Sequence, residues 1–150
     1  MSITDVDLTP GITVGTASVD NEFIANGREW ALQGIVTIAS AARDAGNTTV
    51  TKLRKGLVLG RVTSGGKYKE YDNNDTDGTE VARAILDQNV NLLDADSVAR
   101  DVIARVVFDS AVLIHTDRTY NAVAQGGDAN ANIGVSAMAD FDNFKFTAQQ

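Results

Sequence analysis

Short apolar runs, broken by turn residues, occupy the middle of this chain. The β-branched run at residues 35–38 predicts a buried strand. A second strand is predicted from Leu57, with Leu57 and Leu59 as core candidates, and Gly60 within it indicates a bulge or a close backbone approach. The sequence SGG at residues 64–66 predicts a hairpin turn, and the strict alternation of KYKEY after it predicts a half-exposed strand.

The second half of the chain is open to more than one interpretation. Residues 79–90 fit a helix capped by Thr79, and they also fit a strand in the run VARAIL. Residues 100–114 predict one long bent strand or two strands joined near Asp109. The polar, alanine-rich region 116–140 contains a loop, QGGDANANIG, and the aromatic stretch ADFDNFKF after it predicts a short helix leading into a strand.

Together these elements predict a mainly β fold with many short strands, frequent turns and little helix. A length of 150 residues suits one compact domain with its own core. We therefore expect a single β-rich domain over residues 21–150.

The first 20 residues have few large apolar groups and form an extended N-terminal arm in this interpretation. Their alternation predicts a segment that becomes a strand when it adds to the exposed sheet edge of a partner. The alternative is a terminus that is merely frayed. If the arm makes the contact, the candidate contact residues are Ile3, Leu8, Pro10, Ile12, Val14 and Val19.

Composition and charge exclude several classes of partner. The formal net charge of −7 argues against nucleic acid, because binding to phosphates needs clustered cations. No apolar run approaches the roughly 18 residues that cross a bilayer, so we expect no membrane partner. The first 15 residues carry two aspartates and no basic residue, which is unlike a secretory signal. Charge is uneven, since residues 51–70 hold six of the thirteen basic residues; this predicts either an orienting surface or a solvated strand face.

The acidic stretch YDNNDTDGTE at residues 71–80 resembles a calcium loop at first sight. With Gly78 at the sixth loop position, the first, third and fifth are Asn73, Asp75 and Asp77. The twelfth should be a bidentate glutamate and is Ala84, and the segment before the loop is predicted to be a strand rather than a helix. We therefore expect an ordinary polar turn and no bound metal.

Other catalytic patterns fit less well, and we expect no enzyme and no cofactor. The chain has no cysteine, one histidine, no phosphate-binding loop and no G-x-S-x-G sequence. His115, which ends an apolar run, is interpreted as a strand-end residue with a local hydrogen bond rather than a general base with Asp117. Trp30 is expected in the core or at an interface.

Residues 35–90 resemble the head decoration protein family of tailed bacteriophages. The resemblance rests on an ordered series of short motifs: VTIAS, then L-x-x-G-x-V-L-G-x-V-T, then GKY-x-x-Y, then DG-x-x-x-A-x-x-I-L. The chain departs from the family pattern by extra residues in IASAARDAGNTT and by added length after residue 115. The motif positions expected to be structural are Leu53, Gly56, Val58, Leu59, Gly60, Tyr68, Tyr71, Asp77 and Gly78.

The resemblance implies a β-clip-like decoration fold that assembles as a homotrimer. It further implies that the trimer binds the major capsid protein at local three-fold sites on the outer surface of the expanded capsid, after assembly in the host cytoplasm. In this family an N-terminal arm that is mobile in the free protein orders on the capsid by pairing with its strands. The alternative function is a phage accessory module that recognises a glycan or a host surface through residues 116–140. Nucleotide hydrolases of the dUTPase kind share the β-clip class, but none of their motif spacing is present.

Overall fold

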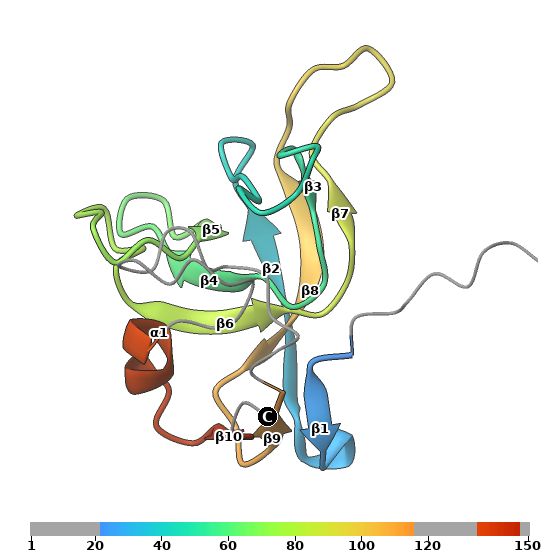
Figure 1. The fold of residues 1–150 in the computed structure, drawn as a ribbon. Helices are drawn as coiled ribbons and strands as arrows, with labels where there is room; N and C mark the ends of the chain where they lie inside the picture. Colours follow the sequence, from blue (N-terminus) through green and yellow to red (C-terminus); the bar gives the residue numbers. More distant parts are fainter. Residues whose placement is uncertain (1–21, 116–134, 148–150) are drawn as a thin grey trace, which may run out of the picture.

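The computed structural model describes residues 22–115 and 135–147, and in this part the chain is mainly β with one short α-helix (Figure 1). The predicted fold class is therefore confirmed. The predicted arm and most of region 116–140 lie outside the described residues.

Five strands form a small closed barrel in the order β2-β5-β4-β6-β8. β8 pairs with the whole of β2 on one side and with β6 on the other. β4 and β5 form the hairpin predicted around residues 64–66. The strands are β2 (Leu32–Ile38), β4 (Val58–Arg61), β5 (Tyr68–Glu70), β6 (Ala82–Leu86) and β8 (Val102–Phe108).

Few contacts close the barrel between β2 and β5. The two strands run parallel and pair only at Ile38 and Tyr68. The amide of Ala39 adds one hydrogen bond to the carbonyl of Tyr68, at 2.9 Å. Most of β2 is therefore paired with β8 alone among the described residues.

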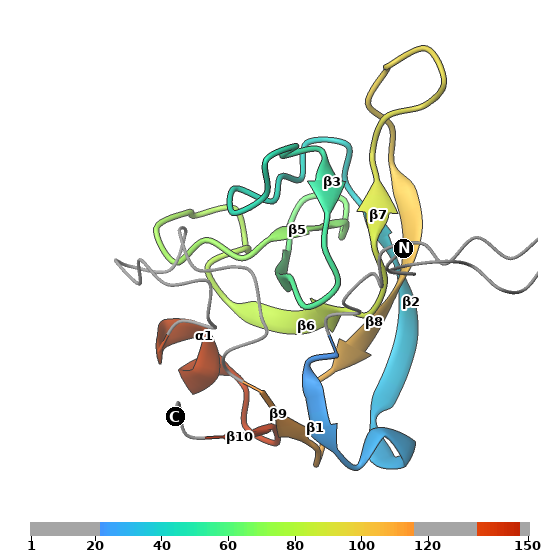
Figure 2. The same cartoon turned by 45° about the vertical axis from the view of Figure 1, so that its right-hand side comes forward.

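Two smaller sheets lie at opposite ends of the barrel, as Figures 1 and 2 show. At one end, β1 (Ile24–Asn26), β9 (Leu113–Ile114) and β10 (Lys145–Phe146) form a sheet in the order β1-β9-β10. At the other, β3 (Lys52–Leu53) pairs with β7 (Val90–Asn91), and the β7–β8 connection projects as a loop. A 3-10 helix, η1 (Arg28–Trp30), precedes β2, and the helix α1 (Val135–Asp140) lies beside β6.

The core has two parts. One fills the barrel around Leu57, Leu59 and Leu86 and continues under β3 and β7. The other joins the barrel to the β1-β9-β10 sheet, where Phe141 and Phe144 pack edge to face with ring centroids 4.8 Å apart. The aromatic C-terminal stretch therefore completes the core between the barrel and the β1-β9-β10 sheet.

Several of the predicted elements are present. Leu57 and Leu59 are buried, and the β4–β6 register shifts between Leu59 and Gly60, which confirms the bulge. Residues 100–114 form two strands, β8 and β9, separated after Phe108. Residues 82–86 form a strand, so the helical alternative for this segment is wrong.

One expectation from the sequence is wrong, and a second is narrowed to one of its two alternatives. Residues 35–38 are not a buried strand, because Ile35 is 71% exposed and only Ile38 is fully buried. Trp30 was expected in the core or at an interface; at 75% exposure it is not in the core, and a role at an interface stays a prediction. Ile35 faces solvent because β2 has core on one face only, and Trp30 belongs to η1, which has no buried residue.

Candidate functional site

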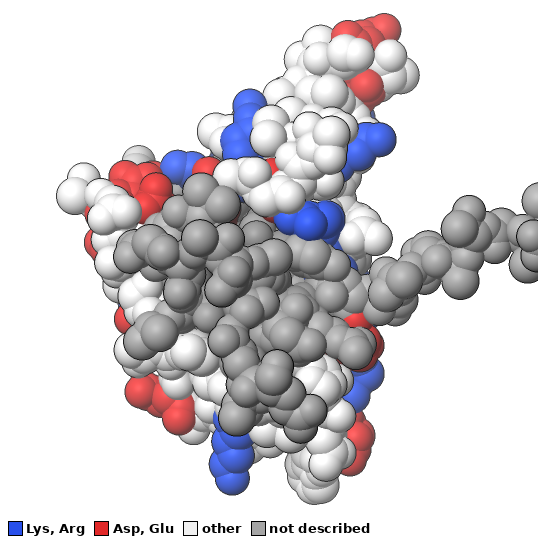
Figure 3. Space-filling model, in the orientation of Figure 1, with Lys and Arg blue, Asp and Glu red and all other residues white. Residues whose placement is uncertain are grey.

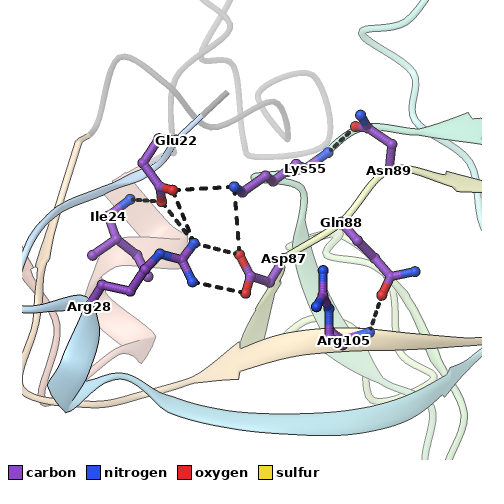
Figure 4. Close-up of polar contacts among 8 residues, drawn as sticks. All are labelled: Glu22, Ile24, Arg28, Lys55, Asp87, Gln88, Asn89 and Arg105. Atoms are coloured by element: carbon purple, nitrogen blue, oxygen red, sulfur yellow. Dashed lines mark hydrogen bonds and ion pairs between the residues drawn. The ribbon is translucent and has the colours of Figure 1, made fainter. Parts of the chain in front are cut away.

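Four charged residues join the first described residues to the barrel. Glu22 precedes β1, Arg28 opens η1, Lys55 precedes β4, and Asp87 follows β6 (Figure 4). We call Glu22, Arg28, Lys55 and Asp87 the arm-root cluster, because the predicted arm, residues 1–20, ends two residues before Glu22.

Arg28 is the centre of this cluster. It donates from Nη1 and Nη2 to the two carboxylate oxygens of Asp87, at 3.2 and 2.9 Å, and from Nη2 to both oxygens of Glu22, at 3.0 and 3.1 Å. Lys55 Nζ lies 3.3 Å from Glu22 Oε2 and 3.9 Å from Asp87 Oδ1. Two acids and two bases thus balance one another, with Lys55 and Asp87 nearly buried.

The electrostatics favour the charged form of the cluster. Partial burial raises the pKa of Glu22, but the hydrogen bonds from Arg28 and from the amide of Ile24 outweigh it, so the pKa of Glu22 is lowered overall. The hydrogen bonds from Arg28 to Asp87 raise the pKa of the Arg28 guanidinium. A charged Glu22 therefore fixes where the chain enters β1.

Sequence reasoning missed the arm-root cluster. Its members are separated by up to 65 positions along the chain, from Glu22 to Asp87, and none belongs to a recognisable motif. The only available signal was the presence of Glu22 and Arg28 at the end of the predicted arm, which does not identify Lys55 or Asp87 as partners.

A second feature is a strip of exposed apolar side chains along the outer face of β2 and β8. Ile35 lies opposite Arg105 in the ladder and Ile103 lies opposite Thr37, so the two isoleucines are diagonal neighbours. Their exposed fractions are 71% and 70%. Leu32 and Trp30, near the start of β2, are also exposed, although Leu32 lies on the opposite face of the strand from Ile35. Grouped exposed apolar residues of this kind are typical of a contact surface.

The acidic stretch 71–80 is a folded turn whose carboxylates have partners. Asp77 accepts hydrogen bonds from the Thr79 amide at 3.0 Å and the Thr79 hydroxyl at 2.5 Å, and it pairs with Lys69 at 3.2 Å. The hydrogen bond from the Thr79 side chain, with the amide of Thr79 and Lys69, lowers the pKa of Asp77. Within residues 22–115 and 135–147, no group of three or more potential ligands could hold a metal ion.

Gly78 is required by the shape of this turn. Its φ is +108°, and an added Cβ would lie 2.5 Å from the carbonyl oxygen of Arg61. The amide of Thr63 donates to the carbonyl of Asp77 at 2.7 Å, so the turn folds back onto the end of β4.

The remaining motif positions lie in and around the barrel. Tyr71 is fully buried and its hydroxyl donates to Asn73 Oδ1 at 3.1 Å. Gly56, with φ of +97°, precedes β4, and Gly60 packs against the backbone of Thr79. Leu53, Val58 and Leu59 are buried in β3 and β4, and Tyr68 is half-buried in β5. The motif thus specifies core and turns rather than a reactive centre.

The basic residues of 51–70 do not form a free cationic patch. Arg54 pairs with the fully buried Asp44 at 2.7 Å, Lys67 with Asp101 at 2.6 Å, and Lys55 belongs to the arm-root cluster. Figure 3 shows basic and acidic side chains interspersed over the visible described part of one face. Of the two interpretations, the structure favours charges that are paired or solvated.

Other polar candidates have local structural contacts. The amide of His115 donates to the carbonyl of Phe23 at 2.7 Å, which joins the end of β9 to the start of β1. Asp140 Oδ2 accepts from the amide of Ala82 at 2.8 Å and so ties α1 to β6. Asp94 accepts from the amides of Asp96 and Val98 within the projecting loop.

Several predicted residues lie outside the described part of the chain. These are the arm residues Ile3, Leu8, Pro10, Ile12, Val14 and Val19, together with Asp117 and residues 116–134 of the alternative binding region. No helix among the described residues has the length and apolarity that a membrane span requires.

A small β barrel with a charged clamp at its first described residues and an exposed apolar strip is an architecture suited to structural assembly. The model of the bacteriophage lambda head decoration protein D family matches residues 22–136, and the chain belongs to this family. The suspected resemblance is therefore confirmed. Membership implies binding to a phage capsid and a place in the virion. A search of curated proteins found no match.

Proposed function

We propose that this protein is a capsid cement that binds as a homotrimer at local three-fold sites on the outer surface of the expanded phage head. The trimer stabilises the shell through strand addition by residues 1–20, while residues 21–150 form the β-clip-like body. Its partner is the major capsid protein, and assembly takes place in the host cytoplasm.

The arm-root cluster is the observation that carries the arm mechanism. A segment that pairs with a capsid strand must leave the body at a defined point, since a loosely attached arm loses more entropy on binding. Glu22 is held by Arg28 at 3.0 Å and by Lys55 at 3.3 Å directly after the arm. The clamp therefore supports an arm whose position relative to the body is fixed at its root.

The exposed strip on β2 and β8 supports an assembled state. Ile35 and Ile103 are each about as exposed as a surface residue, so a monomer leaves both isoleucines in water. A closed trimer gives such surface a partner, and it presents three arms to the capsid at once. Simultaneous engagement raises avidity by orders of magnitude without any stronger single contact.

Deletion of residues 2–15 tests the arm mechanism. We expect the shortened protein to keep its trimer mass in analytical ultracentrifugation and its thermal midpoint. Its binding to expanded capsids should fall at least about 100-fold, because three weak strand contacts are lost together. The matched control is an arm of the same composition with scrambled order, which removes the alternation and keeps the charge. Normal capsid binding by either variant would contradict the mechanism.

A further inference from the structure

The edge of β2 that faces away from β8 is open. β8 pairs with β2 from Leu32 to Ile38, whereas β5 meets β2 only at Ile38. Between residues 32 and 37, no backbone hydrogen bond from this second edge to any other described residue is present. In Figure 1 most of β2 extends away from the end that meets β5. An unpaired strand edge is a template for another strand.

A groove runs beside this open edge. It has a volume of about 380 Å³ and lies between Ile35, Val36 and Thr37 of β2 and the β4–β5 hairpin with Arg61, Lys67 and Tyr68. A neighbouring hollow of about 590 Å³ shares Arg61 and Tyr68 and is also lined by Arg83. The groove thus combines an open backbone edge, the apolar side chains of Ile35 and Val36, and two cations, Arg61 and Lys67, while Arg83 lines the neighbouring hollow.

The positive charges in and beside the groove determine which kind of strand can bind there. Arg61 and Arg83 are exposed and make no ion pair with any other described residue, while Lys67 pairs with Asp101. A second β2 edge would bring the same cations together, so pairing between two copies is disfavoured. An acidic strand with apolar residues on alternate positions fits both these positive charges and the side chains of Ile35 and Val36.

The first 21 residues of this chain have that chemistry. They contain Asp5, Asp7 and Asp20 and no lysine or arginine. In DVDL, Val6 and Leu8 alternate with Asp5 and Asp7, so a strand there has one apolar and one acidic face. Residues 116–134 match less well, because they contain Arg118 beside Asp117 and Asp128.

The arm is long enough to reach the groove. Its root at Glu22 contacts Lys55, and Arg61 lies six residues further along the chain, at most about 20 Å away. The thirteen residues from 9 to 21 span up to about 43 Å when extended. Residues 5–8 can therefore lie along β2 of the same chain.

We propose that, in the free protein, residues 5–8 of the arm add as a strand to the open edge of β2, with Asp5 and Asp7 toward Arg61 and Lys67. This proposal goes beyond capsid binding and refines the expectation of a mobile arm. The arm exchanges between the position paired with β2, which we call the arm-binding edge, and solvent. When residues 5–8 are bound there, they cover the exposed edge of β2, and the capsid competes with this edge for the same arm residues.

Hydrogen–deuterium exchange of the free full-length protein, without capsid, tests whether the arm pairs with the edge of β2. Amides of residues 33–37 that do not bond to β8 should exchange about 3- to 10-fold more slowly than in a variant lacking residues 2–14, while β8 amides exchange equally in both. D5N/D7N should lose most of this protection, whereas the control T4N/T9N keeps it. Protection should also fall as salt rises.

Three outcomes would overturn the proposal. These are equal exchange of β2 in the full-length and shortened proteins, protection that disappears on dilution and so belongs to a second copy, and protection that survives deletion of the arm but not of residues 117–133. Because capsid is absent, each outcome is independent of the capsid-binding result. A shortened protein that fails to bind capsids but shows unchanged β2 exchange would be consistent with the proposed function and would contradict pairing of the arm with β2.

Discussion

Strands β6 and β2 flank the same strand, β8, and they differ in nearly every physical respect. β6 is paired on both edges, with β4 and β8, and four of its five residues are buried. Among the described residues, β2 is paired along its length with β8 and meets β5 only at Ile38, and its outer face exposes Ile35. The molecule thus places its rigid core on one side of β8 and its available edge and apolar surface on the other.

This difference suggests that stability and interaction can be changed separately. A change beside β6 should act on the free energy of unfolding. A change on the outer face of β2 should act on association. The predictions below run from the largest expected effect on stability to the smallest.

Gly60→Ala should be the most destabilising of these changes. A Cβ at Gly60 would lie 2.5 Å from Cα and 2.6 Å from the carbonyl oxygen of Thr79, so backbone must move. We expect a loss of about 3 kcal/mol in the free energy of unfolding, measured by urea titration. Gly65→Ala is the control: nothing lies within 4 Å of its added Cβ, so only its φ of +87° costs energy, about 1 kcal/mol. Equal losses would mean that close packing against Thr79 is unimportant.

Gly34→Ala is the corresponding change in β2 and should cost less. Its added Cβ overlaps the ring of Phe108, which is a partly exposed side chain rather than backbone. The ring can rotate away, so we expect about 1 kcal/mol in the same titration. A loss as large as that of Gly60→Ala would show that β2 is as tightly constrained as β4 and β6, against the contrast drawn above.

Glu22→Gln tests the arm-root cluster through pH. The pKa of Glu22 is lowered in the folded protein, so its contribution is fully present above the unfolded value near 4.5 and is lost as pH falls through the folded value. Because Glu22 is 38% exposed, we expect only about 0.5 kcal/mol at pH 7. The difference in thermal midpoint between wild type and variant should vanish in acid. A difference that persists in acid would mean that the carboxylate charge is not the cause.

Ile35→Ser should leave stability almost unchanged. Ile35 is 71% exposed, so the free energy of unfolding should change by less than about 0.5 kcal/mol. If the protein forms the proposed trimer, sedimentation should nevertheless show it dissociating at several-fold higher protein concentration than wild type. Thr37→Ser, on the same face, is the matched control, and it should change neither the free energy of unfolding nor the concentration at which the assembly dissociates. A large loss of stability in the Ile35 variant would place this residue in the core of the free subunit.

The sequence predicted best where contacts are local. Leu57, Leu59 and Gly60 were assigned correctly, because a hairpin over residues 57–70 is specified by its own turn glycines and alternation. The acidic stretch was interpreted as a turn for the same reason, and Asp77 indeed bonds to Thr79 two residues away.

Prediction failed where the environment depends on distant segments. The β-branched run at 35–38 fits a fully buried strand and a half-exposed strand equally well, and only tertiary packing, which buries Ile38 and leaves the other face of β2 without core among the described residues, places Ile35 in solvent. Residues 79–90 remained open between helix and strand, and pairing with β4 and β8 decided for the strand.

By itself, the sequence determined the mainly β class, the turn chemistry and the ordered motif that marks the family, because these depend on residue type and short spacing. The tertiary structure alone brought Glu22, Arg28, Lys55 and Asp87 together and left most of one edge of β2 without a partner among the described residues. Ion pairing and strand pairing act over a few ångströms in space, and closure of the barrel decides which distant residues come within that range.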